Sequence, residues 1–367
     1  MRPELTVHAT DGRARVQTVR TARGTFETPV FMPVGTRAAV RHLAAADHDL
    51  LGVEVVLANT YHLMLRPGDE RIARLGGLHD FAGWQGHYLT DSGGYQVFSL
   101  SPDVDDDGVR FRSTYDGSTH DFTPEDAVRV QRNLGADIQM VLDVCPPLPS
   151  SRRVIRAAVD RTAAWAARAR TAFVGGDDGT QAQFGIVQGG TDEDLRRESA
   201  ERTIACDFDG YAVGGLSVGE DRVALLETLD GTTRHLPADR LRYLMGVGDP
   251  VGLVEGIAMG VDMFDCVLPT RLARHGTALT WTGRKNLKNR EFADDDRPID
   301  PEFDEPATGQ PSRAYLRHLL NTNEPTAARL LTLHNVSWLI GLVAEARTAI
   351  ASGTLDELRR RTASAWG

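Results

Sequence analysis

Residues 260–271 read Gly-Val-Asp-Met-Phe-Asp-Cys-Val-Leu-Pro-Thr-Arg, a short apolar run that stops at a proline. Such a run predicts a buried strand, with the isolated Asp265 near its C-terminal end. Far upstream, His87-Tyr88-Leu89-Thr90 leads in the same way into Asp91 and a glycine-rich turn. Two acids that face one cleft can divide covalent and acid/base duties at a sugar carbon. We therefore take Asp265 as the candidate nucleophile and Asp91 as its partner.

The same pattern, a β-branched or aromatic run followed by a polar or glycine-rich break, recurs along the chain. Helical spacing predicts helices between the runs, at residues 38–51, 124–134, 151–173, 191–205 and 221–229, which implies parallel strands. A doubly wound sheet would alternate likewise, but polar breaks after nearly every run favour the rim of a (β/α)8 TIM barrel. The eight runs are residues 30–32, 53–57, 87–90, 138–142, 183–187, 210–213, 242–245 and 263–267.

The barrel is expected to have additions at both ends. Turn signals at Asp11-Gly12 and Arg23-Gly24 predict an antiparallel cap over residues 1–28, followed by the barrel over residues 29–286. A polar, proline-rich excursion opens a C-terminal subdomain over residues 287–348. Helices are expected at 312–321 and 326–348, and a final one near 355–365 within the last segment, 349–367.

Composition restricts the class of protein. The chain has 367 residues, 41% of them hydrophobic, three scattered cysteines and a net charge of −10. These values predict a cytoplasmic protein without a membrane span, signal peptide or disulfide framework. The negative charge argues against indiscriminate polyanion binding, but a local basic patch could still bind RNA. Such a patch is suggested by the basic residues that gather after Asp265, between residues 271 and 290, although a solvated surface would look the same.

Further polar groups follow the other predicted strands. Gly93-Gly94 would let the backbone approach a flat ligand, on which Tyr95 could stack. Asp143 is suited to the ring N–H and amine of a guanine-like base, although a structural salt bridge would equally explain it. Gln188 offers a side-chain amide, and the glycines at 214–215 offer backbone N–H groups. The glycines could equally be no more than turn residues. Cys145 and Cys266 are expected to be small buried groups rather than nucleophiles.

Taken together, these segments resemble the bacterial-type tRNA-guanine transglycosylase (queuine tRNA-ribosyltransferase) family over nearly the whole chain. The spacing of the motifs makes coincidence implausible. The resembling segments are residues 91–100 (Asp-Ser-Gly-Gly-Tyr-Gln-Val-Phe-Ser-Leu), 185–190 (Gly-Ile-Val-Gln-Gly-Gly), 214–220 (Gly-Gly-Leu-Ser-Val-Gly-Glu), 243–248 (Tyr-Leu-Met-Gly-Val-Gly), 262–271 (Asp-Met-Phe-Asp-Cys-Val-Leu-Pro-Thr-Arg) and 312–319 (Ser-Arg-Ala-Tyr-Leu-Arg-His-Leu).

The resemblance implies a base exchange at the wobble guanosine of tRNAs with a GUN anticodon. Asp265 would attack the ribose and expel guanine, and Asp91 would deprotonate the incoming 7-aminomethyl-7-deazaguanine. The implied base-binding residues are Ser92, Gly93, Gly94, Tyr95, Asp143, Gln188, Gly215, Leu216 and Met245. The implied RNA-contacting residues are Gly246, Val247, Gly248, Asp249, Pro250, Val251, Gly252, Thr270, Arg271, Leu272, Ala273 and Arg274. The chain also ends without the C-terminal RNA-binding domains of archaeal relatives, which favours the bacterial substrate.

One departure from the family concerns its zinc site. The resemblance implies a CxCxxC motif before residues 312–317, and its cysteines would fall on Phe303, Glu305 and Thr308. Only the fourth ligand is kept, as His334. Because a structural zinc site needs about four donors, we expect no zinc and no other cofactor, with ordinary packing, Phe303 included, filling the space. Glu305, His334 and a nearby Asp could bind a metal only weakly, because such a site would lack thiolate ligands.

Two other functions remain open at this point. The chain could be a non-catalytic RNA-binding partner subunit, which the missing cysteines would suit, or it could exchange bases in DNA or another RNA. The two acids argue against the first alternative, since a subunit without catalysis needs no carboxylates in a cleft. Because the subdomain shapes the family's homodimer interface, the dimer is only a possibility here.

Overall fold

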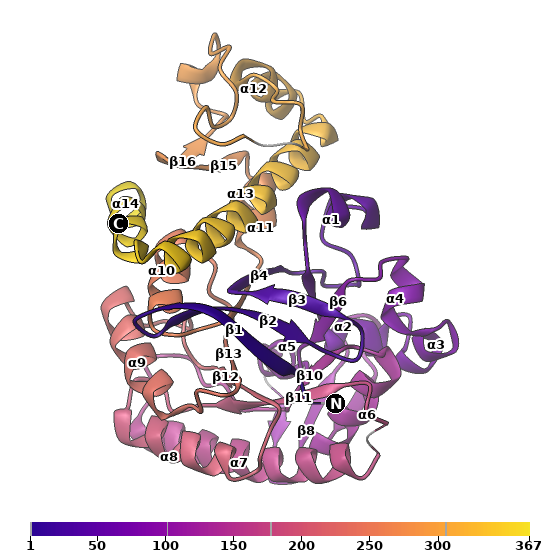
Figure 1. The fold of residues 1–367 in the computed structure, drawn as a ribbon. Coiled ribbons are helices and arrows are strands. Elements are labelled where there is room, and N and C mark those ends of the chain that lie inside the picture. Colours follow the sequence, from indigo (N-terminus) through magenta and orange to yellow (C-terminus); the bar gives the residue numbers. More distant parts are fainter. Residues whose placement is uncertain (1, 101, 177, 305–306) are drawn as a thin grey trace.

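The centre of the computed structural model, which describes residues 2–100, 102–176, 178–304 and 307–367, is an eight-stranded sheet (Figure 1). The strands pair in parallel in the order β4-β14-β13-β12-β11-β10-β6-β5. A parallel bridge between Val34 and Leu57 joins β4 to β5 and closes the barrel, so the predicted fold is confirmed. The strands are β4 (Val30–Pro33), β5 (Val55–Ala58), β6 (His87–Thr90), β10 (Ile138–Met140), β11 (Ala182–Val187), β12 (Gly210–Val213), β13 (Leu241–Leu244) and β14 (Met263–Cys266).

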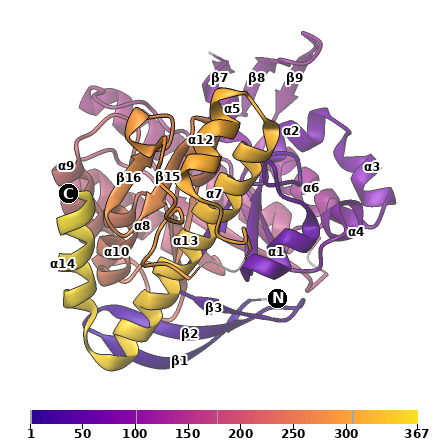
Figure 2. The same ribbon diagram turned by 90° about the horizontal axis from the view of Figure 1, so that it is seen from above.

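Helices surround the sheet, as the view from above shows (Figure 2). The start of α6 illustrates why the sequence folds in this way: Thr123 accepts a hydrogen bond from Asp126 N at 3.1 Å, Pro124 opens the first turn, and Gly135 ends the helix at φ +71°. The helices of the barrel are α1 (Ala45–Leu51), α2 (Thr60–Leu65), α3 (Asp69–Arg74), α4 (Gly77–Ala82), α5 (Gly94–Phe98), α6 (Pro124–Leu134), α7 (Arg152–Val174), α8 (Glu193–Ile204), α9 (Arg222–His235), α10 (Pro250–Ala258) and α11 (Leu268–Arg274).

Two parts of the barrel differ from the expectation. The helix predicted from residue 38 begins only at Ala45, because Ala38 (φ +60°) and His42 (φ +69°) have left-handed backbones that a helix cannot contain. A three-stranded antiparallel sheet, which the sequence reasoning missed, follows α5. Its strands, β7 (Asp103–Val104), β8 (Val109–Arg112) and β9 (Thr119–Phe122), are too short for a clear alternation.

The N-terminal cap is an antiparallel sheet of β1 (Glu4–Asp11), β2 (Ala14–Arg20) and β3 (Thr25–Thr28), as predicted. It lies across the N-terminal ends of the barrel strands. Arg15 forms a buried ion pair of 2.7 Å with Asp262, just before β14, and Thr21 bonds His87 at the start of β6. The cap therefore covers the end of the barrel opposite to the predicted site.

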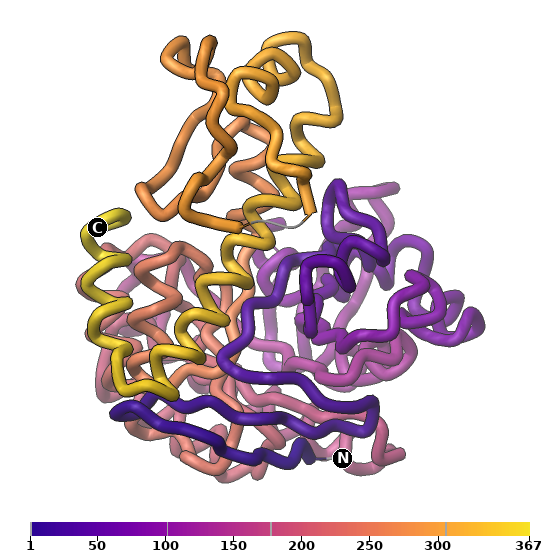
Figure 3. Tube along the Cα trace, turned by 45° about the horizontal axis from the view of Figure 1, so that its top comes forward, coloured from indigo at the N-terminus to yellow at the C-terminus, as the bar shows by residue number. Residues whose placement is uncertain are grey.

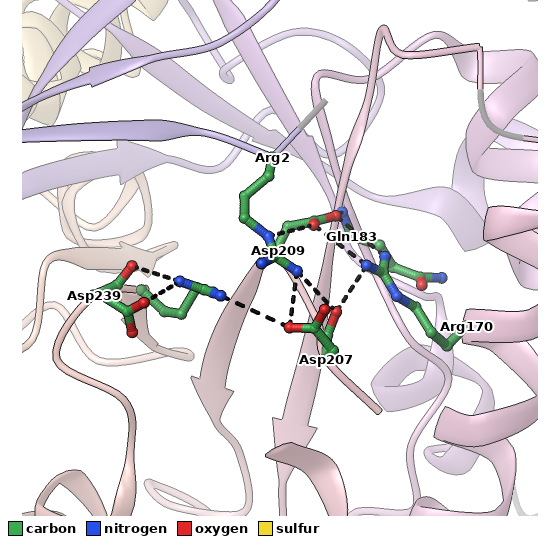
Figure 4. Close-up of polar contacts among 7 residues, drawn as sticks. Arg2, Arg170, Gln183, Asp207, Asp209 and Asp239 are labelled. Carbon is green, nitrogen blue, oxygen red and sulfur yellow. Dashed lines mark hydrogen bonds and ion pairs between the residues drawn. The ribbon is translucent and has the colours of Figure 1, made fainter. Parts of the chain in front are cut away.

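Ion pairs also secure the chain just before β1 to this end of the barrel (Figure 4). Arg2 pairs with Asp207 at 2.9 Å and with Asp209 at 3.3 Å, both just before β12. Asp209 also pairs with Arg170 from α7 at 3.2 Å and accepts a hydrogen bond from Gln183 N at 3.0 Å. This network holds the strand ends on the side of the barrel away from Asp91 and Asp265.

The C-terminal subdomain projects from the barrel, and α13 leads from it back to the barrel wall (Figure 3). Its own small core joins the β15–β16 hairpin to α12 and α13 through Ala278, Leu287, Phe292, Leu316 and Leu331. The elements are β15 (Thr277–Thr280), β16 (Gly283–Asn286), the 3-10 turn η1 (Arg290–Phe292), α12 (Arg313–Asn321), α13 (Pro325–Ser352) and α14 (Leu355–Trp366).

One helix of the described chain, α13, is long and apolar enough to cross a membrane, with a window of mean hydropathy 1.3. However, 67% of that window is buried inside the fold. Its apolar residues Trp338, Leu339 and Leu342 belong to the main core. The composition of α13 is therefore that of a core helix, which packs against other protein elements.

Candidate active site

The predicted site residues meet at the C-terminal ends of six barrel strands. Asp91 follows β6, Asp143 follows β10, Gln188 follows β11, Gly215 follows β12 and Met245 follows β13, while Asp265 lies near the end of β14. In a parallel barrel these ends share one rim, where active sites form. The strand order places β4 and β5 between β14 and β6, so Asp265 and Asp91 stand on the same rim with two strands between them.

Asp265 is a buried carboxylate, 9% exposed, with two neutral donors. The Tyr243 hydroxyl donates to Oδ1 at 2.6 Å and Gly246 N donates to the same oxygen at 2.7 Å. Burial raises the pKa of Asp265, and the two donors oppose that rise. Both donors bind Oδ1, and among the described residues none donates to Oδ2, which is therefore the oxygen available for a reaction.

Asp91 is a half-buried carboxylate at the mouth of the barrel. Asn59 Nδ2 donates to Oδ2 at 2.5 Å, and Thr60 N donates to Oδ1 at 2.8 Å. Burial raises the pKa of Asp91 to about 6. The hydrogen bonds from Asn59 and Thr60, and those from Gln96 and Gly93, act in the opposite direction. A group with this pKa is mostly ionised at neutral pH and can still take up a proton, as a general base must.

The two acids influence a common neighbour. The pKa of Tyr243 is raised well above its usual value by burial first, then by the charge of Asp265 and its hydrogen bond, and also by the charge of Asp91. Both carboxylates therefore lie near the Tyr243 hydroxyl. Within the described ranges, neither forms an ion pair with an arginine or lysine, so both remain available for chemistry.

Asp143 and Gln188 form a second buried pair, 6% and 1% exposed. Gln188 Nε2 donates to Asp143 Oδ2 at 2.6 Å. Burial raises the pKa of Asp143 to about 6, and the charge of Asp91 adds to this, while Gln188 opposes it. Among the described residues no donor reaches Gln188 Oε1, which leaves a buried acceptor beside the carboxylate.

The glycines between these groups allow close packing of the rim. Gly93 has φ +82° and Gly215 has φ +65°, conformations that favour glycine. A Cβ at Gly215 would lie 2.2 Å from Gln188 Oε1, and one at Gly94 would lie 3.2 Å from Asp143 O. Ser92 Oγ accepts from Gly94 N at 3.2 Å, which holds the turn after Asp91. These positions therefore bring the backbone of two loops against the Asp143–Gln188 pair.

The remaining predicted base contacts differ in exposure. Tyr95 is 66% exposed at the start of α5, whereas Met245 is half-buried and Leu216 is buried in the barrel core. Tyr95 is therefore free to contact a ligand at the mouth. Cys145 and Cys266 are half-buried rather than fully buried as expected, but burial still raises the pKa of each thiol to about 12 and keeps it protonated.

The two predicted RNA loops flank Asp265. Asp249 caps α10 and pairs with Arg222 at 3.1 Å, and Gly246 holds Asp265. The side chains of Val247, Pro250, Val251, Thr270 and Ala273 are buried, so these residues shape the loops from inside. Arg271 is exposed and Arg274 is half-buried.

Arg41, which the sequence reasoning missed, joins this basic group. The pKa of Arg274 is lowered by burial first and then by the charges of Arg41 and Arg271. Three like charges thus gather beside α11 in a protein whose net charge is −10. Such a patch is suited to a phosphate backbone.

Other residues at the site were also missed by the sequence reasoning. Tyr243, Asn59 and Thr60 hold the two acids, and each lies in or next to a predicted strand, which could have marked it. Arg196 from α8 is 1% exposed and donates to four main-chain carbonyls, those of Gly190 and Gly214 at 2.7 Å and those of Val187 and Gly215 at 3.1 Å. Burial lowers its pKa to about 10. It ties the loops after β11 and β12 together beneath Gln188.

Comparison with known proteins agrees with this geometry. A family model described as queuine tRNA-ribosyltransferase matches residues 10–367. The chain is 51% identical to the queuine tRNA-ribosyltransferase of Oleidesulfovibrio alaskensis, over 98% of this chain and 95% of that protein. It is also 50% identical to the protein of that name from Caulobacter vibrioides, over 96% of each chain. The resemblance seen in the sequence is therefore confirmed, and the chain belongs to the queuine tRNA-ribosyltransferase family, a family of pentosyltransferases.

Proposed function

We propose that this protein exchanges the wobble guanine of GUN-anticodon tRNAs for 7-aminomethyl-7-deazaguanine by double displacement. The observation that supports this most is the arrangement of Asp265 and Asp91 on one rim without cationic partners in the described chain. Asp265 keeps one oxygen to which no described residue donates, and Asp91 has a pKa of about 6.

The first displacement forms a covalent ribosyl-enzyme. Asp265 Oδ2 attacks the anomeric carbon of the ribose, the glycosidic bond breaks, and guanine leaves with the bonding electrons and takes up a proton from solvent. Tyr243 and Gly246 fix the nucleophile through Oδ1. Because the polymer stays bound through the ester to Asp265, the departing base can be replaced without loss of the RNA.

The second displacement restores the RNA with a new base. Asp91 takes the proton from the ring nitrogen of the incoming deazaguanine, which then attacks the anomeric carbon and releases Asp265. Two inversions preserve the configuration of the sugar. Asn59 and Thr60 hold the Asp91 carboxylate in place for this step.

The base itself is held by the second buried pair. Asp143 accepts from the ring N–H and exocyclic amine of the guanine-like base, with Gln188 and the backbone at Gly215 and Leu216 facing its carbonyl edge. Tyr95 and Met245 contact its two faces. The geometry that favours this assignment is the buried Asp143–Gln188 contact of 2.6 Å, beside glycines that bring the backbone of two loops close to the pair.

The RNA backbone is proposed to lie over the loops that flank Asp265. These are residues 246–252 and 270–274, with Arg271 and Arg274 nearest to phosphate and Arg41 beside them. The protein is proposed to work in the cytoplasm. A homodimer stays a prediction, which analytical ultracentrifugation of the purified chain would test.

The test is release of radiolabelled guanine from the wobble position of tRNA in the presence of free 7-aminomethyl-7-deazaguanine. The wild-type protein should release label, and the Asp265→Asn variant should not, although it should still bind tRNA. Binding by the wild-type protein without release would favour the partner-subunit alternative. A DNA or other RNA substrate that releases label faster than tRNA would favour exchange on another polymer.

A further inference from the structure

The position of the family's zinc site contains a different set of groups in this chain. Of the four ligands that the family resemblance implies, only His334 is kept, and residue 305 lies outside the described residues. The three cysteines of the chain, Cys145, Cys206 and Cys266, all precede the subdomain in sequence. Within the described ranges, no three His, Cys, Asp or Glu side chains gather in a way that could hold a metal ion. The donor set therefore does not fit a structural zinc, which needs about four nitrogen or sulfur ligands.

The retained histidine has a structural partner. His334 lies on α13, is 1% exposed, and its Nε2 bonds the Leu279 carbonyl of β15 at 2.8 Å. The next residue, Asn335, accepts from Leu279 N at 2.8 Å and donates to Thr277 O at 2.9 Å. Two adjacent side chains of α13 thus fasten the β15–β16 hairpin through hydrogen bonds.

Phe303 fills the space beside this histidine. Its ring meets the His334 imidazole edge to face, with centroids 5.9 Å apart and planes at 84°. Gly341 lies two turns further along α13, where a Cβ would come within 2.8 Å of Phe303 Cε2. The absence of a side chain at Gly341 therefore creates the notch in which the ring lies, and the ring also packs against the main core.

The loop that leads to Phe303 is held by charge-assisted hydrogen bonds. Arg313 of α12, 4% exposed, pairs with Asp295 at 3.0 Å and donates to Ile299 O. Asp300 accepts from Trp281 N at 2.7 Å, next to β15. These contacts fix the loop on both the α12 side and the hairpin side, a task that a metal ion often performs in a small subdomain.

From these contacts we infer that an aromatic anchor, Phe303 seated on His334 and in the Gly341 notch, replaces the structural zinc of the family and lets the C-terminal subdomain fold without metal. The inference concerns folding rather than catalysis. It therefore stands or falls separately from the proposed reaction.

The first test uses the full chain, expressed with zinc in the medium and purified without chelator. Elemental analysis should find far less than one zinc per chain, and the melting temperature should be the same with and without a strong chelator. Near-stoichiometric zinc, or a melting temperature that falls with chelator, would overturn the inference.

The second test removes the anchor. Phe303→Ala should lower the melting temperature by several degrees and speed amide exchange in β15 and around His334, with Phe303→Leu in between. Phe81→Ala is the matched control, because Phe81 is 39% exposed on α4, outside the subdomain. If Phe303→Ala behaves like the control, the ring is not an anchor.

The third test rebuilds the metal site at the same place. The triple variant Phe303→Cys, Glu305→Cys, Thr308→Cys restores the CxCxxC spacing opposite His334. It should bind one zinc per chain, and its melting temperature should become sensitive to chelator. If the triple variant folds but takes up no zinc, Phe303 does not stand where the family's metal binds.

Discussion

The Tyr243 hydroxyl donates a 2.6 Å hydrogen bond to Asp265 Oδ1, which joins two neighbouring barrel strands at the proposed nucleophile. This bond opposes the rise that burial causes in the pKa of Asp265. The hydroxyl thus keeps the Asp265 carboxylate ionised over a wider pH range. In the proposed reaction it would leave the other carboxylate oxygen, Oδ2, to attack.

Tyr243→Phe should therefore move the acidic limb of the pH–rate profile upward. Without the donor, the pKa of Asp265 rises further, and a charge-assisted hydrogen bond is worth about 1.5–3 kcal/mol, so the rate at low pH should fall about ten- to a hundredfold. Guanine exchange measured between pH 5.5 and 9 checks this. Tyr88→Phe is the control, since the Tyr88 hydroxyl is buried without a partner in the described chain. An unshifted limb in Tyr243→Phe would contradict the assigned role.

Asp143→Asn should stabilise the fold at neutral pH while it weakens base binding. The folded pKa of Asp143 is about 6, and an unfolded aspartate has a pKa of about 3.9. Between these values the folded state keeps a proton that the unfolded state has lost, so stability falls as pH rises from about 4 to 6. The variant has no carboxyl group to titrate at this position, so its stability does not fall in this way. It should be up to about 3 kcal/mol more stable than the wild-type protein at pH 7.5, and the difference should shrink toward pH 4.

Asp47→Asn should change the folding stability in the opposite direction and serves as the comparison. Its hydrogen bond to Arg329 lowers the pKa of Asp47, so its contribution to stability is present above the unfolded pKa and is lost as pH falls through the folded one. This substitution should destabilise at neutral pH. Urea unfolding of both variants across pH 4–8 measures how the stability of each changes with pH. The same change in both variants would show that burial does not raise the pKa of Asp143.

Arg196→Lys should raise the KM for the base more than it lowers kcat. An ammonium group cannot reach the four carbonyls that the guanidinium binds, so the loops after β11 and β12 lose a shared support beneath Gln188. We expect about a tenfold or larger rise in KM, since one lost charge-assisted hydrogen bond costs about 1.5–3 kcal/mol. Arg197→Lys, an exposed neighbour paired with Asp194, should leave KM unchanged. Steady-state kinetics with varied base would separate these outcomes.

Asp262→Ala should destabilise the junction of the cap and the barrel. Asp262 is fully buried and accepts from Arg15, Gln17 and Arg242 N, so its removal strands the buried Arg15 charge. The expected cost is about 3–5 kcal/mol. Glu4→Ala, which removes the exposed 4.0 Å pair with Arg20, should cost less than about 0.5 kcal/mol. Chemical denaturation measures both; similar losses in the two variants would mean that burial adds nothing to the Asp262 contacts.

The sequence was most informative where structure depends on local pattern. The eight strands and their polar ends were visible because buried parallel strands are short apolar runs and α6 has its own caps. The late start of α1 was not, since the left-handed backbones at Ala38 and His42 occur at residues other than glycine and so leave no signal in the sequence. The roles of Tyr243 and Arg196 were likewise hidden, because a hydrogen bond to a distant strand end leaves no periodic trace in the sequence.

The cap over the N-terminal strand ends has a consequence for how molecules pass through the site. Because β2 lies across the start of β14 and β6, departing guanine and the replacement base have to use the same opening, at the mouth of the barrel beside Tyr95. Free guanine and the incoming base should then compete for the pocket and should never occupy it at the same time.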